Sequence, residues 1–449
     1  MFFLEKSDTS LTKAHTLEIL ISQHEMKLNT EQSRLFRRRR ALVMLCMLAT
    51  LVYLYFPLIT HRFGEGYDVR IGPQDVFNDT LGFSKVFVIS RPVRSDRRDA
   101  LTLAGAVSNL SFEWIDGVDG DTVPERVLPP DGHEWSATST AARGSWRAHM
   151  NALRSVVSQS LESALIMEDD VDWDARLKSQ MTIFSLASNQ WLEHSRSDSS
   201  GTKSEDESIL NFVPPPAVGK RESSKWDKEE VARLSIPLDW HSRPAATSSP
   251  YGDGWDVLWL GHCGSEYPKP DSGLPQHRIF ISDDLTVPAP RHLKPHSFAR
   301  NDPLSELYPP YSRVVHAANG TVCTLAYAVS QQGARKLLLQ FGLQAFRKQW
   351  DVMLGEWCDG AYAKPSPAGG KNAGNSNMPV CVTVQPPLIS HHHARDGGSD
   401  IQGQGGGYDR RVGTPYVRFS VRMNMDKLVR GAGLDELVDQ WPDGGDVGL

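Results

Sequence analysis

The sequence lacks the patterns that identify several common enzyme classes. It contains neither the Walker phosphate-binding pattern of ATP-hydrolysing enzymes nor the G-x-G-x-x-G pattern of dinucleotide-binding domains. Its five cysteines are widely spaced and form no C-x-x-C pair, which argues against a structural zinc site. There is no internal repeat, and the formal net charge of -6 argues against a nucleic-acid partner. The function must therefore be inferred from what the chain does contain.

Long hydrophobic runs are also scarce, with one clear instance at residues 41–59. These nineteen residues carry no charge, and as a helix they would cover the roughly 30 Å hydrocarbon core of a membrane. Arg37–Arg40 stand directly before the run, and the positive-inside rule keeps such a flank in the cytosol. We therefore predict a cytoplasmic tail at 1–40 and a transmembrane signal-anchor helix at 41–60. The C-terminal part is then lumenal, in the Golgi or endoplasmic reticulum membrane. A buried core helix is the alternative.

Two weaker features agree with a lumenal location. The N-x-[ST] glycosylation pattern occurs only after the hydrophobic run, at Asn78, Asn109 and Asn319. The cysteines beyond the run form an even set, which favours two disulfides in an oxidising compartment. These cysteines are Cys263, Cys323, Cys358 and Cys381, and the sequence leaves all three pairings open.

The composition divides the predicted lumenal part into segments. A stem at 61–83 precedes a folded domain at 84–402. Two stretches, at about 189–252 and 268–311, are interpreted as insertions. The first is rich in Ser, Glu, Lys, Pro and Asp and is expected to build no core, with some order possible at 226–234, and the second is a Pro-rich loop. A Gly-rich tail at 403–449 follows the domain.

Hydrophobic periodicity predicts an α/β domain. Strands are expected at 86–89, 112–115 and 164–167, with helices at 97–107 and 145–157 between them. This β-α-β-loop-α-β order favours a parallel-type sheet with helices on its faces. Further strands are predicted at 255–260, 325–329 and 382–384, a helix at 331–340, and an amphipathic stretch at 425–438.

A cluster of five carboxylates follows the third predicted strand. It comprises Glu168, Asp169, Asp170, Asp172 and Asp174. Ligands of open α/β sheets bind beyond the carboxyl ends of strands, so the cluster is expected at the mouth of a site. Crowded carboxylates repel one another, and Mn²⁺ or Mg²⁺ bound to a diphosphate relieves that repulsion. We predict Asp169, Asp170 and Asp172 as metal ligands, with the metal acting as a Lewis acid on the leaving diphosphate. The alternative is a solvated acidic turn.

A basic segment follows the first predicted strand and begins a helix. Guanidinium groups and helix N–H groups at such a turn suit the phosphates, or the uracil and ribose, of a nucleotide. The predicted binding residues are Ser90, Arg94, Asp96, Arg97 and Arg98. The alternative is a solvated basic helix start.

The order of these segments resembles the family-25 glycosyltransferases, which include bacterial lipooligosaccharide galactosyltransferases and animal procollagen galactosyltransferases. The likeness covers most of residues 84–402. Its segments are 86–90 with 95–98, 114–120, 144–149, 164–171, 255–261, 327–334, 386–388 and 399–401. The chain departs from the family pattern at Ser145 and Ala148, where a Cys and a Ser are usual, and at Arg91, where a Leu is common.

The resemblance implies a GT-A-like nucleotide-diphospho-sugar transferase fold. It also implies a UDP-sugar donor, most often UDP-galactose, a glycan or glycoprotein acceptor, and inverting transfer without a covalent intermediate. By the same resemblance, Glu168, Asp169 and Asp170 serve the metal and diphosphate, while Asp96, Arg97 and Arg98 lie near the donor. His149 is the retained histidine of the 144–149 motif and is a further candidate for donor binding.

The general base of an inverting transfer must take a proton from the acceptor hydroxyl. Asp351 and Glu356 are the candidates, with Asp256 as a less favoured third, and Asp170 is also placed in the catalytic group. Gly261 and His262, at a strand end, are predicted to line the donor pocket.

The adjacent histidines His391–His393 cannot all face one ion, so one of them is expected to approach the donor or its metal. Two rival functions remain at this stage. One is a catalytically inactive relative that binds glycan or nucleotide sugar as an adaptor, and the other is a metal-dependent hydrolase of phosphoesters.

Overall fold

The structure is a computed structural model that describes residues 76–130, 140–200, 228–241, 247–293, 304–363, 378–393 and 412–444. All of them belong to one unit, Arg70–Leu449. The predicted cytoplasmic tail and the predicted membrane helix at 41–60 lie outside the described residues. Within the described residues, no helix is both long enough and apolar enough to cross a membrane.

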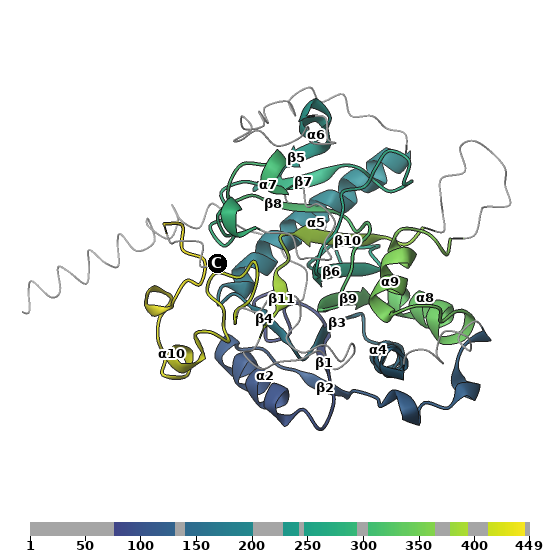
Figure 1. Cartoon of the computed structure of the whole chain (residues 1–449). Helices are drawn as coiled ribbons and strands as arrows, with labels where there is room; N and C mark the ends of the chain where they lie inside the picture. Colours follow the sequence, from purple (N-terminus) through teal and green to yellow (C-terminus); the bar gives the residue numbers. More distant parts are fainter. Residues whose placement is uncertain are drawn as a thin grey trace, which may run out of the picture. The chain divides into compact units, whose positions relative to one another are not determined.

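Among the described residues, nine strands form one mixed sheet (Figure 1) in the order β2-β1-β3-β9-β6-β10-β8-β7-β5. The strands are β1 (Lys85–Ser90), β2 (Glu113–Asp116), β3 (Ser163–Glu168), β5 (Ser235–Pro237), β6 (Val257–Gly261), β7 (Arg278–Ile281), β8 (Arg313–Ala317), β9 (Ala326–Ser330) and β10 (Cys381–Gln385). β1 is parallel to both β2 and β3, which confirms the expected parallel unit. β9 and β8 are antiparallel to their neighbours. The fold is therefore mixed α/β.

Helices and shorter elements complete the described part. The α-helices are α2 (Ser95–Ser108), α4 (Thr140–Ser158), α5 (Leu177–Ser200), α6 (Lys228–Leu234), α7 (Leu304–Leu307), α8 (Gln331–Leu337), α9 (Trp350–Cys358) and α10 (Met425–Val429). A π-helix, η6 (Leu338–Gln344), continues α8, and short 3-10 turns are η1 (Gly120–Thr122), η2 (Glu125–Val127), η5 (Pro290–His292) and η7 (Leu434–Glu436). β4 (Val171–Trp173) and β11 (Ile389–His391) form a separate antiparallel pair.

Helix α4 shows why the sequence folds as it does around the site. Trp146, Met150 and Leu153 recur at helical spacing and are fully buried in the main core, while Trp146 Nε1 donates to the carbonyl oxygen of Phe341 at 2.9 Å. The next element, β3, is buried on both faces and reads as a continuous apolar run. Burial of α4 against the sheet thus sets the position of β3 and of the acidic residues that follow it.

Parts of both predicted insertions belong to the folded core. Residues 189–200 continue α5, whose Trp191 and Leu192 are buried. The second predicted insertion contains β7, which pairs with β8. A four-residue strand between proline-rich flanks gives too short a periodic signal to be recognised. Residues 201–227 lie outside the described residues.

The two ends of the predicted domain also differ from expectation. Phe83, assigned to the stem, is buried and stacks on Tyr251 with ring centroids 4.8 Å apart. Residues 412–444, assigned to the tail, fold against the acidic segment, and Ser420 forms a β-bridge with Asp174. Val76 and Leu81 of the predicted stem are buried as well, as are Val417 and Val421 of the predicted tail.

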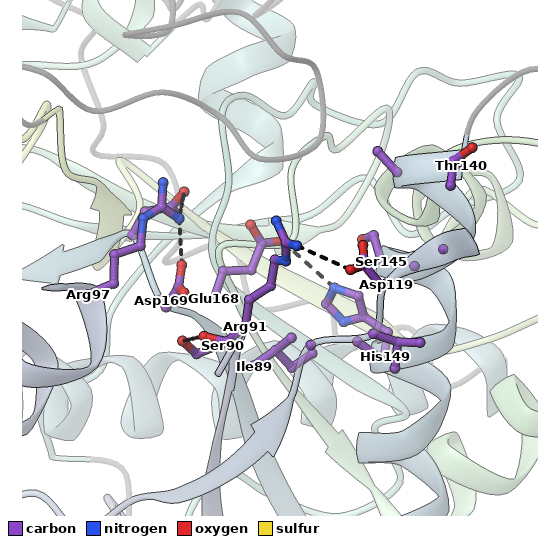
Figure 2. Close-up of a pocket in the computed structure, with 17 residues that line it drawn as sticks. Ile89, Ser90, Arg91, Arg97, Asp119, Thr140, Ser145, His149, Glu168 and Asp169 are labelled. Carbon is purple, nitrogen blue, oxygen red and sulfur yellow. Dashed lines mark hydrogen bonds and ion pairs between the residues drawn. The ribbon is translucent and has the colours of Figure 1, made fainter. Parts of the chain in front are cut away.

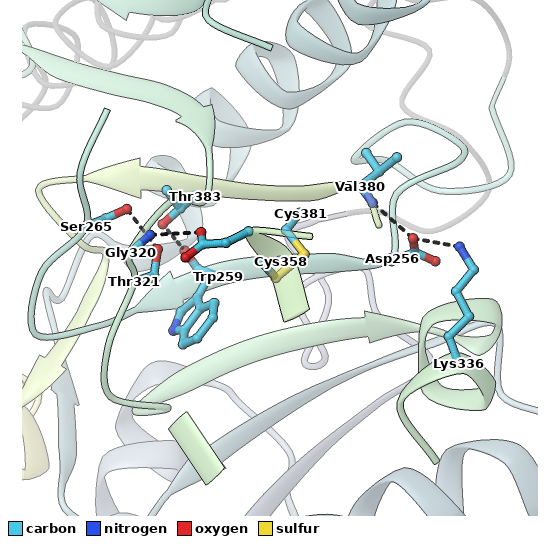
Figure 3. The surroundings of a disulfide bond; sticks show 11 residues. Asp256, Trp259, Ser265, Gly320, Thr321, Lys336, Cys358, Val380, Cys381 and Thr383 are labelled. Carbon is cyan, nitrogen blue, oxygen red and sulfur yellow. Dashed lines mark hydrogen bonds and ion pairs between the residues drawn. A yellow bond between two sulfur atoms is a disulfide. The ribbon is translucent and has the colours of Figure 1, made fainter. Parts of the chain in front are cut away.

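The structure selects one of the three disulfide pairings. Cys263 bonds to Cys323 across 60 residues, and Cys358 bonds to Cys381 across 23 residues. The second disulfide fastens α9 to β10 (Figure 3).

Candidate active site

A pocket of about 320 Å³ lies beyond the carboxyl ends of β1, β2 and β3. This is the sheet edge where open α/β folds bind ligands. Figure 2 shows basic, acidic and imidazole side chains converging on it from the strand ends and from α4. Its lining residues are Ile89, Ser90, Arg91, Arg97, Gly117, Val118, Asp119, Gly120, Thr140, Ala141, Gly144, Ser145, Ala148, His149, Glu168, Asp169 and Asp170.

Arg97 brings the basic and acidic motifs together. It lies in the first turn of α2, and its Nη1 is 2.5 Å from Asp169 Oδ1 and 3.0 Å from Asp170 Oδ2. Burial and the neighbouring Asp170 raise the pKa of Asp169, while Arg97 opposes that shift. One guanidinium therefore holds two adjacent carboxylates that would otherwise repel each other.

Asp170 is held between two basic side chains. Its Oδ2 contacts Arg97 and is also 3.3 Å from Nε2 of His391. Burial favours the neutral form, but His391, Arg97 and Arg422 prevail and lower the pKa of Asp170. Its other oxygen, Oδ1, is buried and accepts no hydrogen bond from any described residue.

Glu168 and His149 form the inner wall of the pocket. Glu168 Oε1 accepts a hydrogen bond from Thr324 Oγ1 at 2.8 Å and lies 3.8 Å from His149 Nε2. Burial, with a contribution from Asp170, raises the pKa of Glu168 to about 8. Burial lowers the pKa of His149 to about 3, so this imidazole is neutral at physiological pH.

Glycines allow the opposite wall to approach closely. A Cβ on Gly144 would overlap the carbonyl oxygen of Val118, and a Cβ on Gly120 would overlap that of Thr140. The loop at 117–120 therefore packs backbone to backbone against the first turns of α4. This contact leaves the loop backbone and the side chain of Asp119 at the pocket surface.

A divalent metal fits this site only with ligands from a bound substrate. Among the described residues, no three His, Cys, Asp or Glu side chains form a group that would hold a metal by themselves. The unpartnered Oδ1 of Asp170, with Asp169 beside it, offers one or two carboxylate ligands. Mg²⁺-type ions are commonly bound by one or two carboxylates together with substrate phosphates and water.

The C-terminal segment fixes the shape of the acidic turn. Arg422 donates from Nε to the carbonyl oxygen of Val171 at 2.8 Å and from Nη2 to that of Asp169 at 2.9 Å. Asp172 is fully buried below the turn and accepts hydrogen bonds from Thr414 and Ser420. The carboxylate of Asp172 therefore anchors the C-terminal segment and does not face the pocket.

The structure separates the predicted nucleotide-binding residues. Four of them line the pocket, namely Ser90, Arg97, His149 and Glu168, together with two of the predicted metal ligands, Asp169 and Asp170. Arg94 instead pairs with the exposed Asp96 at 2.7 Å, and Arg98 pairs with Asp116 at 2.6 Å. Gly261 packs under Ile389 and Ala326. His262 donates from Nε2 to the carbonyl oxygen of Val384, 2.9 Å away, in the core.

The candidate bases occupy different surroundings. Asp351 accepts a hydrogen bond from the backbone N–H of Cys323 at 3.0 Å and lies near enough to Glu168 to raise its pKa. Glu356 binds Lys348 and Tyr362, and neither it nor these partners line the pocket.

Asp256 lies at the start of β6, the opposite end of that strand from the pocket edge. There it binds Lys336 at 2.8 Å and the backbone N–H of Val380 at 3.0 Å (Figure 3).

Several pocket residues were not predicted as binding residues. Arg91, Asp119, Thr140 and Ser145 line the pocket. Asp119 and Ser145 fall inside motifs that carry the family resemblance, so those motifs offered a signal for them. Thr140 lies five residues before the predicted start of its helix, and nothing in the local pattern distinguishes it.

Comparisons with known proteins bear on this site. No protein-family model matches the chain. It is 26% identical over 113 residues to procollagen galactosyltransferase 1 of Danio rerio, and the match covers 23% of this chain and 19% of that protein. It is 24% identical over 115 residues to procollagen galactosyltransferase 2 of Mus musculus and of Homo sapiens, which covers 23% of this chain and 18% of each relative.

The chain is distantly similar to the procollagen galactosyltransferases. This similarity supports the resemblance to family-25 glycosyltransferases that the motifs indicated, and it supports a transferase activity. The match spans about a fifth of the length of these relatives.

Proposed function

We propose that this chain is a glycosyltransferase of GT-A-like fold that transfers a sugar, galactose in the first instance, from a UDP-sugar to a glycan or glycoprotein acceptor. One observation carries the proposal: Arg97, Asp169 and Asp170 meet in a pocket at the carboxyl edge of parallel strands. A pocket that presents both a cation and carboxylates suits a metal-bound diphosphate. The similarity to galactosyltransferases supports the choice of sugar.

In this proposal, Asp169 and Asp170 would hold Mn²⁺ or Mg²⁺, and Asp172 would support the turn from below. The metal, when bound, neutralises charge that develops on the departing diphosphate. Arg97 fixes the orientation of both carboxylates before the ligand arrives. The 117–120 loop, packed closely against α4, forms the opposite wall of the pocket. Neither candidate base lines the pocket, and Asp351 is favoured over Glu356 because its charge is near enough to the pocket residue Glu168 to raise the pKa of that carboxyl.

The decisive experiment is a donor screen with Mn²⁺ that measures UDP release by the full chain in the presence of glycan acceptors. We expect release with one UDP-sugar, loss of release on chelation of the metal, and a decrease of at least about 100-fold in kcat for Asp170→Ala. Asp351→Asn should lower kcat with little change in donor affinity, because a base acts on the acceptor.

Other outcomes distinguish the rival functions. UDP binding without turnover of any UDP-sugar would indicate an inactive adaptor. This alternative is tested because the chain departs from the family pattern at Ser145 and Ala148, which line the pocket. Phosphate release from simple phosphoesters would indicate a hydrolase. Unchanged metal dependence and sugar transfer in Asp170→Ala would refute the proposed site.

We further propose that residues 41–60 anchor the chain in a Golgi or endoplasmic reticulum membrane with the folded unit in the lumen. The charge pattern around 41–60 and two disulfides in the folded unit support this. Protease treatment of sealed microsomes should remove only the N-terminal tail. Digestion of the folded unit in intact vesicles would contradict the proposed orientation.

A further inference from the structure

One edge of the His149 imidazole is held by a residue outside the predicted site. Nδ1 of His149 lies 2.9 Å from the hydroxyl oxygen of Tyr327, which projects from β9. The ring also stacks on Trp350 with centroids 5.3 Å apart. Both His149 and Tyr327 are buried, so water does not compete for this contact.

The position of the ring proton follows from this contact. Burial lowers the pKa of His149 to about 3 and raises the pKa of Tyr327 well above its usual value, so the imidazole is neutral and the phenol keeps its proton. A buried O–H is costly to leave without an acceptor, and Nδ1 lies within reach. With the phenol donating to Nδ1, the single proton of the neutral ring is on Nε2.

Nε2 faces the pocket together with an acceptor. Glu168 Oε1 lies 3.8 Å away, which is too far for a direct hydrogen bond, and both side chains line the pocket (Figure 2). Thr324 donates to the same Oε1 at 2.8 Å and holds it in place. At this separation, one hydroxyl group of a ligand can accept a hydrogen bond from Nε2–H of His149 and donate one to Oε1 of Glu168.

We propose that Tyr327 is a positioning residue that directs the Nε2–H of His149 into the pocket, and that His149 and Glu168 together recognise one hydroxyl group of a sugar ring. A hydroxyl accepts from Nε2–H and donates to Oε1, the oxygen that also accepts from Thr324, whereas an ionised phosphate oxygen has no proton to donate to it. Ribose and the transferred hexose carry the same group. The inference rests on the proposed function and specifies which ligand group lies against this wall.

The test compares binding of parent ligands and analogues that lack one hydroxyl, measured by calorimetry on the full chain with Mn²⁺. The ribose arm uses UDP, 2′-deoxy-UDP and 3′-deoxy-UDP. The hexose arm uses UDP-galactose and its monodeoxygalactose analogues. We expect the wild type to bind one analogue about 10- to 100-fold more weakly than its parent, because the pair is left without its hydroxyl. The arm that shows the loss identifies the sugar.

Variants then assign the discrimination to the proposed pair. In Tyr327→Phe and His149→Phe, the difference between parent and analogue should shrink to less than about threefold, because the directed donor is lost. His149→Gln should retain it, since the Gln amide nitrogen can occupy the position of Nε2. Tyr308→Phe is the matched control: it removes a buried hydroxyl that bonds to Ser235 at 2.7 Å, and it should leave the discrimination intact.

The possible results separate the two proposals. If the parents bind but no analogue is disfavoured, or if the discrimination survives in both Tyr327→Phe and His149→Phe, the inference is overturned while UDP-galactose binding upholds the proposed function. If wild-type protein binds neither UDP nor any UDP-sugar, the proposed function itself fails. Thermal unfolding of each variant, compared with that of Tyr308→Phe, identifies any variant that does not fold. If a phenylalanine variant does not fold, the test is the comparison of His149→Gln with wild type: loss of the discrimination in His149→Gln overturns the inference.

Discussion

Arg97 and Arg98 are adjacent in sequence, yet their side chains have different partners. Arg97 lines the pocket and binds Asp169 and Asp170, whereas Arg98 does not line it and binds Asp116 and the carbonyl oxygen of Ser90. Successive residues of a helix point about 100° apart, so only one of the two faces the acidic turn. The sequence predicted that this basic segment would bind a nucleotide but assigned both arginines to it.

We predict that substitution of these two arginines separates their roles. Arg97→Met removes the cation between two carboxylates, so their pKa values should rise and the turn should lose its fixed orientation. UDP-sugar affinity should fall about 10- to 100-fold. Arg98→Met, the matched control, should change affinity less than about threefold. Equal effects of the two substitutions on donor binding would contradict the assignment.

At the scale of elements, the pocket depends on how closely the 117–120 loop approaches α4. The sequence correctly predicted α2, α4 and the strands β1 to β3, because helical spacing marks the two helices and short runs of apolar or aromatic residues mark the strands. It did not predict that α4 begins at Thr140, because the first turn of α4 contains no large apolar residue that would mark the start of the helix. The close contact requires a residue without a Cβ at Gly144.

Gly144→Ala should therefore displace the loop from α4. We expect a loss of about 1 to 3 kcal/mol in the free energy of unfolding and weaker binding of UDP. Gly342→Ala is the matched control, because a Cβ there would meet its nearest neighbours at ordinary distances of 3.8 and 3.9 Å. It should be neutral or stabilise the protein by up to about 1 kcal/mol. Urea denaturation and UDP titration measure both effects; a Gly144→Ala protein that matched Gly342→Ala would refute the packing argument.

At the scale of the whole molecule, the described C-terminal residues and both disulfides complete the folded unit. Residues 412–424 hold the acidic turn through Arg422 and through the hydrogen bonds that Asp172 accepts, although they follow a Gly-rich stretch that resembles a tail. The core also contains buried neutral histidines far from the pocket lining. Burial lowers the pKa of His262 to about 4 and that of His316 to about 3.

These two histidines predict how stability depends on pH. Their folded pKa values lie below the unfolded value near 6.5, so the unfolded state takes up protons first as the pH falls. The stabilisation is therefore fully present above about pH 6.5 and decreases toward pH 4, by about 1.4 kcal/mol per pH unit for each histidine. Urea denaturation at pH 7, 6 and 5 measures this slope. His316→Gln should reduce it by about one histidine's share, and an unchanged slope would show that His316 does not contribute.

The sequence by itself determined the class of the fold and the order of the basic and acidic motifs. Helical spacing marks α2 and α4 and short apolar runs mark β1 and β3, and this local order is enough to place Arg97 after one strand and Asp169 after another. Parallel pairing then brings both strand ends to one edge. This is why the basic and acidic motifs were recognisable before any contact was known.

Tertiary structure alone decided which members of those motifs act together. These contacts join residues that are distant in sequence. Arg97 binds Asp169 while Arg98 binds Asp116, Asp172 accepts from Thr414 and Ser420, and Tyr327 contacts His149. No local period encodes such contacts, because they depend on how separate elements pack. The same reason explains the disulfide pairing and the burial of the C-terminal segment.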